Sequence, residues 1–251
     1  MTKLPRKPNV YNRNNRRRRS GFSRELAVLY EDDAVVAVNK PPGLLAVPVE
    51  GSDAPSALSI LIDEFKKKRE RVLVVHRIDR FASGVLLFAK TQTDREALIR
   101  EFLQHTPLRE YVTVVRGQLT PKEATLVHYF RREGMFQKLS SERDSKAARA
   151  ELRYSVTSTC REASLVKVTL ETGLQNQIRV QLAAVGHPIV GDRKYAPAEA
   201  SEKRIARVAL HAVRLQFVHP RTGDEIAVDC KLPPDLQSLI QSLRLAPRKR
   251  R

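Results

Sequence analysis

Short apolar runs rich in valine and leucine, separated by polar turns, are the feature that most constrains how this chain can fold. Runs of this length and composition predict β-strands. They fall at residues 27–30, 34–38, 72–75, 84–89, 111–115, 124–130, 164–170, 209–217 and 225–229. A chain with so many short strands must bury them in one or more sheets.

Helical spacing is found in fewer places. Residues 57–69 and 175–185 each carry apolar side chains on one helical face, and Pro-Pro-Asp at 233–235 predicts the start of a last helix. Thr93 and Glu96 form a capping-box pattern before a further apolar helix face. Many strands with a few interspersed helices favour an α+β (mixed α/β) fold over regular βαβ repeats.

Composition places the chain among globular proteins. Its 251 residues are 41% hydrophobic, enough for one large domain or two small ones, and no apolar run is long enough to span a bilayer. The N-terminus has no apolar segment typical of a secretory signal. Cys160 and Cys230 are isolated, which favours a reducing cytosol over a disulfide framework and gives no support to a zinc site.

The net charge of +18 is concentrated at the two ends. Residues 1–24 contain nine lysines and arginines and no acid, and residues 244–251 contain five more, again without an acid. Removing these 14 from 46 basic residues leaves 32 against 28 acidic residues, a net of +4. We expect both tails to be disordered in the free protein and to bind RNA phosphates electrostatically. The alternative is that they only aid solubility.

One carboxylate stands out between the apolar runs at 72–75 and 84–89. Residues 75–80 read Val-His-Arg-Ile-Asp-Arg, so a strand–turn–strand arrangement would place Asp79 on a loop between Arg77 and Arg80. A carboxylate there can face a cleft while neighbouring arginines keep it ionised. Taken alone, an aspartate next to an arginine is more often a solvated surface salt bridge.

The longer string argues for chemistry. Together with Ser-Gly and an apolar strand ending Phe-Ala-Lys at 83–90, it closely resembles the catalytic motif of the RluA-type pseudouridine synthases, with Asp79 at the position of the catalytic aspartate. Ile78 and Ala82 are mild departures from the usual Leu and Thr. Four further stretches resemble family signatures in the family's order: residues 38–44, 110–117, 172–192 and 210–233. The resemblance covers about residues 25–240.

The resemblance implies a fold, a reaction and a set of catalytic residues. The fold would be a long, bent, mostly antiparallel mixed sheet with flanking helices and a central cleft, formed by residues 25–243. The activity would be the isomerisation of uridine to pseudouridine in ribosomal or transfer RNA. Asp79 would be the catalytic carboxylate, Arg179 its cationic partner, and Tyr111 the active-site tyrosine that stacks on the base or takes its C5 proton. The reaction needs no cofactor and no metal.

RNA is the expected partner, and the protein is expected to be a cytoplasmic monomer that does not bind membranes. Arg77, Arg80, Lys40 and Asn176 are expected to contact RNA, as are four arginines of the N-terminal tail: Arg16, Arg17, Arg18 and Arg19. Many relatives carry a small RNA-binding module before the catalytic domain. About 24 residues are too few for one, so the basic tail is expected to replace it in part.

The third signature departs from the family pattern. Leu174, Asn176 and Gln181 replace an arginine and two histidines, so hydrogen bonding is retained at two of the three positions while all titratable side chains are lost. A non-catalytic RNA-binding or ribosome-assembly factor on the same fold therefore stays open as the alternative. A glycosidase is disfavoured, because only one strongly placed carboxylate is evident where two are normally needed.

Overall fold

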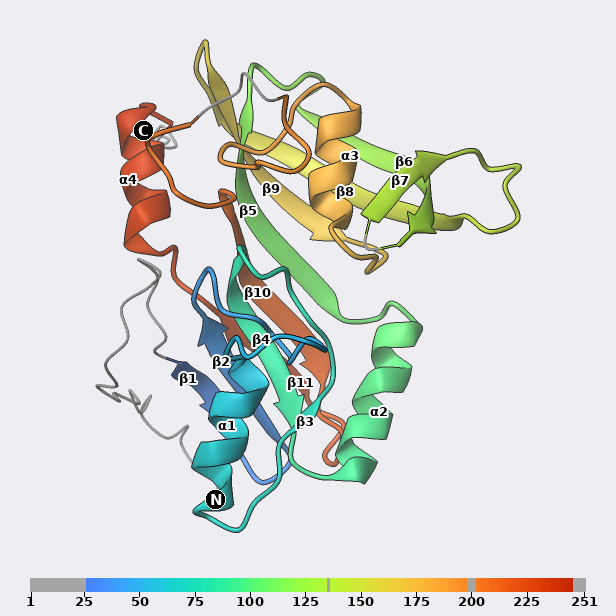
Figure 1. Cartoon of the computed structure of the whole chain (residues 1–251), viewed down its shortest axis with the longest axis vertical. Helices are drawn as coiled ribbons and strands as arrows, with labels where there is room; N and C mark the ends of the chain where they lie inside the picture. Colours follow the sequence, from blue (N-terminus) through green and yellow to red (C-terminus); the bar gives the residue numbers. More distant parts are fainter. Residues whose placement is uncertain (1–25, 135, 198–201, 246–251) are drawn as a thin grey trace. The chain divides into compact units, whose positions relative to one another are not determined.

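The computed structural model describes residues 26–134, 136–197 and 202–245 (Figure 1). The chain forms two compact units. Unit 1 extends to Pro107 and resumes from Ala212 to Lys231; unit 2 runs from Leu108 to His211 and resumes at Leu232. The range 25–243 expected for the catalytic domain therefore spans both units. The tail arginines Arg16–Arg19 and residues 246–251 lie outside the described residues.

Unit 1 combines two helices with short strands. Its elements are β1 (Ala27–Glu31), β2 (Val35–Lys40), α1 (Ala57–Lys66), β3 (Leu73–Val74), β4 (Ser83–Ala89), α2 (Gln92–Leu103), most of β10 (Leu210–Val218) and β11 (Glu225–Asp229). Strand β2 lies between β1 and β4 and pairs antiparallel with both, β3 pairs antiparallel with β4, and β10 forms an antiparallel hairpin with β11.

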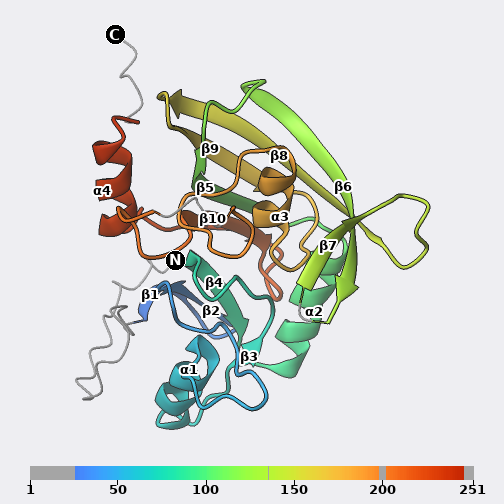
Figure 2. The same ribbon diagram turned by 45° about the horizontal axis from the view of Figure 1, so that its top comes forward.

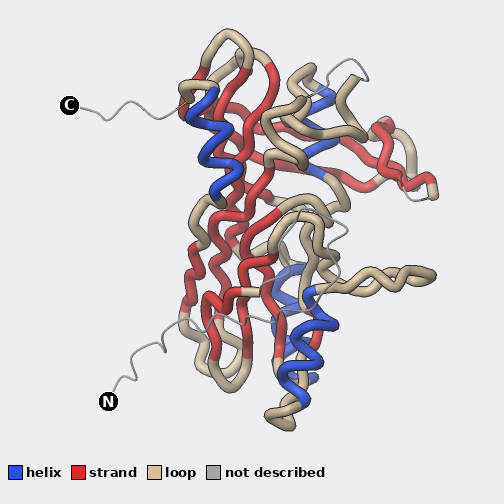
Figure 3. The backbone as a smooth tube through the Cα atoms, turned by 60° about the vertical axis from the view of Figure 1, so that its left-hand side comes forward, coloured by secondary structure: helices blue, strands red, loops and turns tan. Residues whose placement is uncertain are grey.

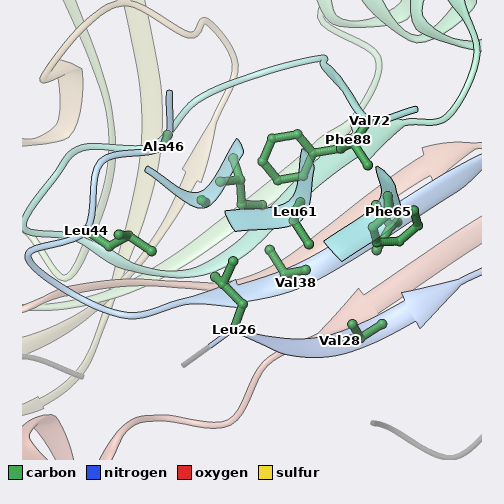
Figure 4. Close-up of a cluster of buried hydrophobic side chains, with 12 residues drawn as sticks. Leu26, Val28, Val38, Leu44, Ala46, Leu61, Phe65, Val72 and Phe88 are labelled. Atoms are coloured by element: carbon green, nitrogen blue, oxygen red, sulfur yellow. The ribbon is translucent and has the colours of Figure 1, made fainter. Parts of the chain in front are cut away.

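The central strands of unit 1 are buried on both faces, which explains why their sequences are continuously apolar rather than alternating. On β2, Val36 and Val38 belong to the cluster that contains Leu61 of α1. Figure 4 shows Val38 beside Leu61 in this cluster. Val35, from the same strand, points into a second cluster with Leu98 of α2. The two helices thus cover opposite faces of this sheet.

Unit 2 combines an antiparallel sheet with two helices, and only some of its neighbouring strands are consecutive in sequence. Its elements are β5 (Leu108–Arg116), β6 (Glu123–Glu133), β7 (Phe136–Ser140), β8 (Ala148–Thr159), β9 (Ala163–Leu170), α3 (Gln177–Ala184), the first residues of β10 and α4 (Pro234–Ser242). The strands pair in the order β5-β9-β8-β6-β7. Figure 2 shows α3 lying over this sheet. Val180 of α3 forms a buried cluster with Phe130 and Ala150.

The helix starts follow local capping chemistry. Helix α1 begins with a capping box in which Ser56 and Ser59 exchange side-chain and backbone hydrogen bonds. The capping residue of α2 is Thr91, whose hydroxyl accepts a hydrogen bond from the backbone of Asp94, so the box expected at Thr93 is wrong by two residues. Helix α4 begins at Pro234, as expected.

The α+β class expected from the sequence is confirmed. Figure 3 shows strands and helices in both units. Two strands, β7 and β8, were not expected. In strand β8, the buried residues Ala150, Leu152 and Tyr154 alternate with the more exposed Glu151 and Arg153, so no apolar run marks it. None of the described helices is long and apolar enough to cross a membrane.

Candidate active site

Asp79 lies on a loop of unit 1, as its sequence context predicts. Residues 75–79 have no regular secondary structure and connect β3 to β4, with a turn at 80–81. The backbone N–H of Ala82 donates to the carbonyl of Asp79 at 3.1 Å and closes this turn. Ile78, just before the aspartate, is 7% exposed and anchors the loop in the apolar interior. Asp79 itself is half-buried.

Lys40 holds the segment that follows Asp79. Its side chain is 0% exposed. The ammonium donates to the carbonyl oxygens of Arg80 and Ala82 at 3.1 and 2.7 Å, and to those of Pro41 and Leu44 at 3.0 and 2.9 Å. The expectation that Lys40 contacts RNA is therefore replaced by a structural role, in which a buried cation ties the 41–44 turn to the loop of Asp79.

The two arginines that flank Asp79 differ in their contacts. Arg77 and Arg80 are both exposed, which is compatible with their expected contacts to RNA. Arg80 also donates through Nε to the carbonyl of Gly43 at 3.1 Å, and its guanidinium lies 5.4 Å from the ring centre of Phe81. His76 accepts the backbone N–H of Leu87 at 3.0 Å, so this histidine shapes the loop.

Unit 2 contains the other two residues expected to be catalytic, Tyr111 and Arg179. Arg179, on α3, forms a buried ion pair with Asp192: Nε to Oδ2 at 2.7 Å and Nη2 to Oδ1 at 2.9 Å, with side chains 9% and 0% exposed. Nη1 donates to Oδ1 of Asn176 at 2.7 Å, and the guanidinium lies 5.0 Å from the ring centre of Tyr195. Arg179 is thus fixed from several sides.

Asp192 is the anchor of this arginine. Burial raises the pKa of its carboxyl, but hydrogen bonds and charge attraction from Arg179 outweigh burial and bring the pKa below its ordinary value. The backbone N–H groups of Lys194 and Tyr195 also donate to Oδ1, at 2.9 and 3.1 Å. Asp192 is therefore held ionised. It lies in the Gly-His-Pro-Ile-Val-Gly-Asp stretch of the sequence, but without the fold nothing linked it to Arg179.

Asn176 has a different role from the expected RNA contact. Its side chain is 9% exposed and binds Arg179, as described above. Asn176 also precedes α3 in the left-handed backbone region, with φ of 56°, which asparagine tolerates better than most residues. It helps to position the catalytic candidate and has little surface to offer to RNA.

The substitutions in the third signature fit their surroundings. Gln181 is 0% exposed, and its Nε2 lies 2.9 Å from the carbonyl oxygen of Leu126 and 3.2 Å from Nδ1 of His128. Burial lowers the pKa of His128, which favours the neutral ring. Leu174 packs against the apolar cluster around Val180. These positions build the unit 2 interior.

Tyr111 lies in β5 opposite Val168 of β9 and is 8% exposed. It shares unit 2 with Arg179, whereas Asp79 belongs to unit 1. The pairing of Asp79 with Arg179 stays a prediction. Among the described residues, no group of three or more His, Cys, Asp and Glu side chains is arranged to hold a metal ion.

Comparison with known proteins gives a consistent family relationship. The sequence model of the RNA pseudouridylate synthases matches residues 34–184. The chain is 30% identical over 235 residues to ribosomal large subunit pseudouridine synthase D of Zymomonas mobilis, covering 89% of this chain and 74% of that protein. It is 33% identical over 226 residues to an RNA pseudouridine synthase of Bacillus subtilis, covering 88% and 73% of the two chains.

The fold is similar to that of solved structures as well. Human RNA pseudouridylate synthase domain containing 4 superposes with a TM-score of 0.72 at 23% identity, covering 87% of this chain and 93% of that chain. Human RNA pseudouridylate synthase domain containing 1 superposes with a TM-score of 0.69 at 22% identity, covering 88% and 96% of the two chains.

Proposed function

This chain belongs to the RNA pseudouridylate synthase family, and from that premise we propose that it isomerises uridines of large-subunit ribosomal RNA with Asp79 as its catalytic carboxylate. The choice of ribosomal over transfer RNA is supported by relatives named ribosomal large subunit pseudouridine synthase D. The observation that carries the assignment of Asp79 is its place on a tethered loop inside the matched range 34–184.

The chemistry requires an ionised carboxylate near the ribose. Breaking the bond between C1′ and N1 of uracil builds positive charge at C1′, which a fixed anion stabilises. The base then turns, C5 bonds to C1′, C5 loses its proton and N1 gains one. No atom or electron is gained or lost overall, so the reaction itself demands no redox partner. Asp79 serves as the anion in this proposal.

Arg179 and Tyr111 support that carboxylate and the base. An arginine beside an aspartate favours the ionised carboxylate, and the ion pair with Asp192 fixes the orientation of the guanidinium. Its N–H groups at Nε, Nη1 and Nη2 bind Asp192 and Asn176. Tyr111 would stack on the extruded uracil and accept the C5 proton.

RNA recognition would use exposed arginines and the basic ends of the chain. Arg77 and Arg80 flank the proposed catalytic residue and are exposed, so both can contact phosphates beside the reacting nucleotide. The nine cations of residues 1–24, including Arg16–Arg19, would add sequence-independent affinity. We further propose that the protein acts as a cytoplasmic monomer without a metal ion.

The test compares wild type, Asp79→Asn and Asp63→Asn on large-subunit ribosomal RNA, with pseudouridine mapped by nucleotide. Asp63 is an exposed aspartate of α1 in the same unit and serves as the matched control. We expect Asp79→Asn to lose at least about 10²-fold in rate with RNA affinity retained, and Asp63→Asn to match wild type. Wild-type turnover by Asp79→Asn would exclude Asp79 as the catalytic group. Tight RNA binding by the wild type without any pseudouridine would favour the assembly-factor alternative.

A further inference from the structure

Arg109 is a buried arginine on the strand that carries Tyr111. The two residues are separated by one position on β5, so their side chains emerge on the same face of the strand. Both are almost fully buried, with 7% and 8% of their surface exposed. A buried guanidinium needs specific partners, because desolvation of a charge is costly.

Those partners lie in the turn that follows β9. Nη2 of Arg109 donates to the carbonyl of Glu171 at 2.8 Å and to that of Leu170 at 3.3 Å. Nη1 lies against Gly173: a Cβ at that position would stand 2.7 Å from it. A side chain at residue 173 would therefore displace the guanidinium. The glycine of this signature makes room for Arg109.

The same turn is connected to the helix that carries Arg179. Gln177 accepts hydrogen bonds from the hydroxyl of Thr172 and the backbone N–H of Leu174, both at 2.9 Å. Gln177 is the first residue of α3. Arg109 thus links the Tyr111 strand to the segment from which α3 and Arg179 begin.

Charge also connects Arg109 with the phenol of Tyr111. Burial lowers the pKa of Arg109, while the charges of Tyr111 and Glu171 oppose that effect. The interaction is reciprocal. If the ionised phenol of Tyr111 stabilises the Arg109 cation, that cation also stabilises the ionised phenol.

The neighbouring charged side chains have partners of their own. Glu110 and Lys167 form an ion pair at 2.6 Å on positions that alternate with the Tyr111 and Val168 face. Glu171 accepts a hydrogen bond from Arg153 at 2.6 Å.

We propose that Arg109 is a positioning residue for Tyr111, holding its strand against the turn before α3 and favouring the proton-accepting form of its phenol. This inference rests on the proposed function of Tyr111. Arg109 itself need not touch the RNA. Its guanidinium acts through the phenol, and Gly173 leaves space for that guanidinium.

The experiment measures single-turnover rates at saturating RNA between pH 6 and 10 for Arg109→Met, Arg109→Lys, Gly173→Ala and Tyr111→Phe. The matched control is Arg116→Met, which removes a half-buried arginine from the same strand. We expect Arg109→Met to be slower at neutral pH by about tenfold to a hundredfold, with RNA affinity unchanged, because a positioned base contributes this much or more.

The pH dependence separates positioning from simple structural damage. Without the cation, the pH at which the rate rises should be higher by about 1–3 pH units. The rate of Arg109→Met should therefore approach that of the wild type at alkaline pH. Arg109→Lys should recover part of the rate, and Gly173→Ala should shift the profile in the same direction as Arg109→Met. Arg116→Met should follow the wild-type profile.

Two results would overturn the inference in distinguishable ways. The role of Arg109 would be refuted if its soluble, folded variants had the wild-type pH–rate profile, or lost the same fraction of the rate at every pH. A slow Tyr111→Phe in the same experiment would still support the role of the phenol. Full activity of Tyr111→Phe would refute both. If Arg109→Met did not fold, Arg109→Lys and Gly173→Ala would decide the question in the same assay.

Discussion

Replacing Asp192 with asparagine tests the anchor of Arg179. The change keeps the size and shape of the side chain but removes its charge. It also turns an N–H₂ group toward a guanidinium that can only donate. Because Asp192 and Arg179 are 0% and 9% exposed, the arginine would be left buried without its counter-charge.

The structure sets the size of the effect. Two short hydrogen bonds, at 2.7 and 2.9 Å, join the pair. Removing one partner from a buried ion pair costs about 3–5 kcal/mol. We therefore expect Asp192→Asn to lower the free energy of unfolding by that amount, and to slow catalysis further because Arg179 is no longer held in one orientation.

Denaturant unfolding at pH 7 gives the measurement, and Asp229→Asn gives the control. Asp229 also contacts an arginine, Arg214, at 2.9 Å, but its side chain is 66% exposed. A pair of that kind contributes less than about 1 kcal/mol. Equal, small losses in both variants would refute the reasoning that burial makes the Arg179 pair strong.

The pH dependence has a definite sign. The pKa of Asp192 is lower in the folded protein than its ordinary value. The stability it adds is therefore complete above the unfolded-state value of about 3.9 and is lost as the pH falls through the folded-state value. The difference in the free energy of unfolding between wild type and Asp192→Asn should accordingly become smaller in acid. A difference that widened below pH 4 would contradict the assignment.

Three further perturbations test other parts of the molecule. Lys40→Met should destabilise unit 1 by about 2–4 kcal/mol and slow catalysis, because buried carbonyls lose a charged donor. Denaturant unfolding and single-turnover rates measure the two effects, and an unchanged rate would show that the Asp79 loop does not depend on Lys40. Tyr111→Phe should bind RNA but stall the reaction, whereas Tyr111→Ala should also bind less tightly; equal full activity would leave Tyr111 a packing residue. Deleting residues 1–24 should reduce the slope of log affinity against log salt concentration by up to about 0.7–0.9 for each phosphate that the tail neutralises. The preference between two RNAs should not change. An unchanged slope would exclude the tail as a phosphate-binding arm.

Strands could be predicted from sequence where burial is two-sided. The strands at 35–40 and 83–89 each contain an uninterrupted apolar run because both faces are covered, and such runs are easily recognised. Strand β8 carries the opposite pattern, with buried and exposed positions alternating. The polar residues of β8, such as those at 153 and 155, resemble a loop in the sequence. Only the neighbouring strands show that the residues between them are buried.

The site was predictable where the local sequence fixes the chemistry and not where distant residues do. Asp79 follows a strand and lies in a turn, both local properties. Lys40 was misread because lysines are almost never fully buried, and only the fold brings four carbonyl oxygens around its ammonium. Asp192 is 13 residues from Arg179, and no spacing rule joins them.

The departures in the third signature have a physical meaning in the folded protein. An arginine at residue 174 would matter most if that position faced RNA, yet Leu174 contributes to the apolar packing around α3. Gln181 is buried and binds carbonyls and His128. A protonated histidine there would meet a neighbouring histidine in a buried setting, whereas an amide donates without carrying charge. The sequence changes therefore adjust the interior beside Arg179 and leave the proposed catalytic residues in place, which favours an enzyme over a scaffold that has lost its chemistry.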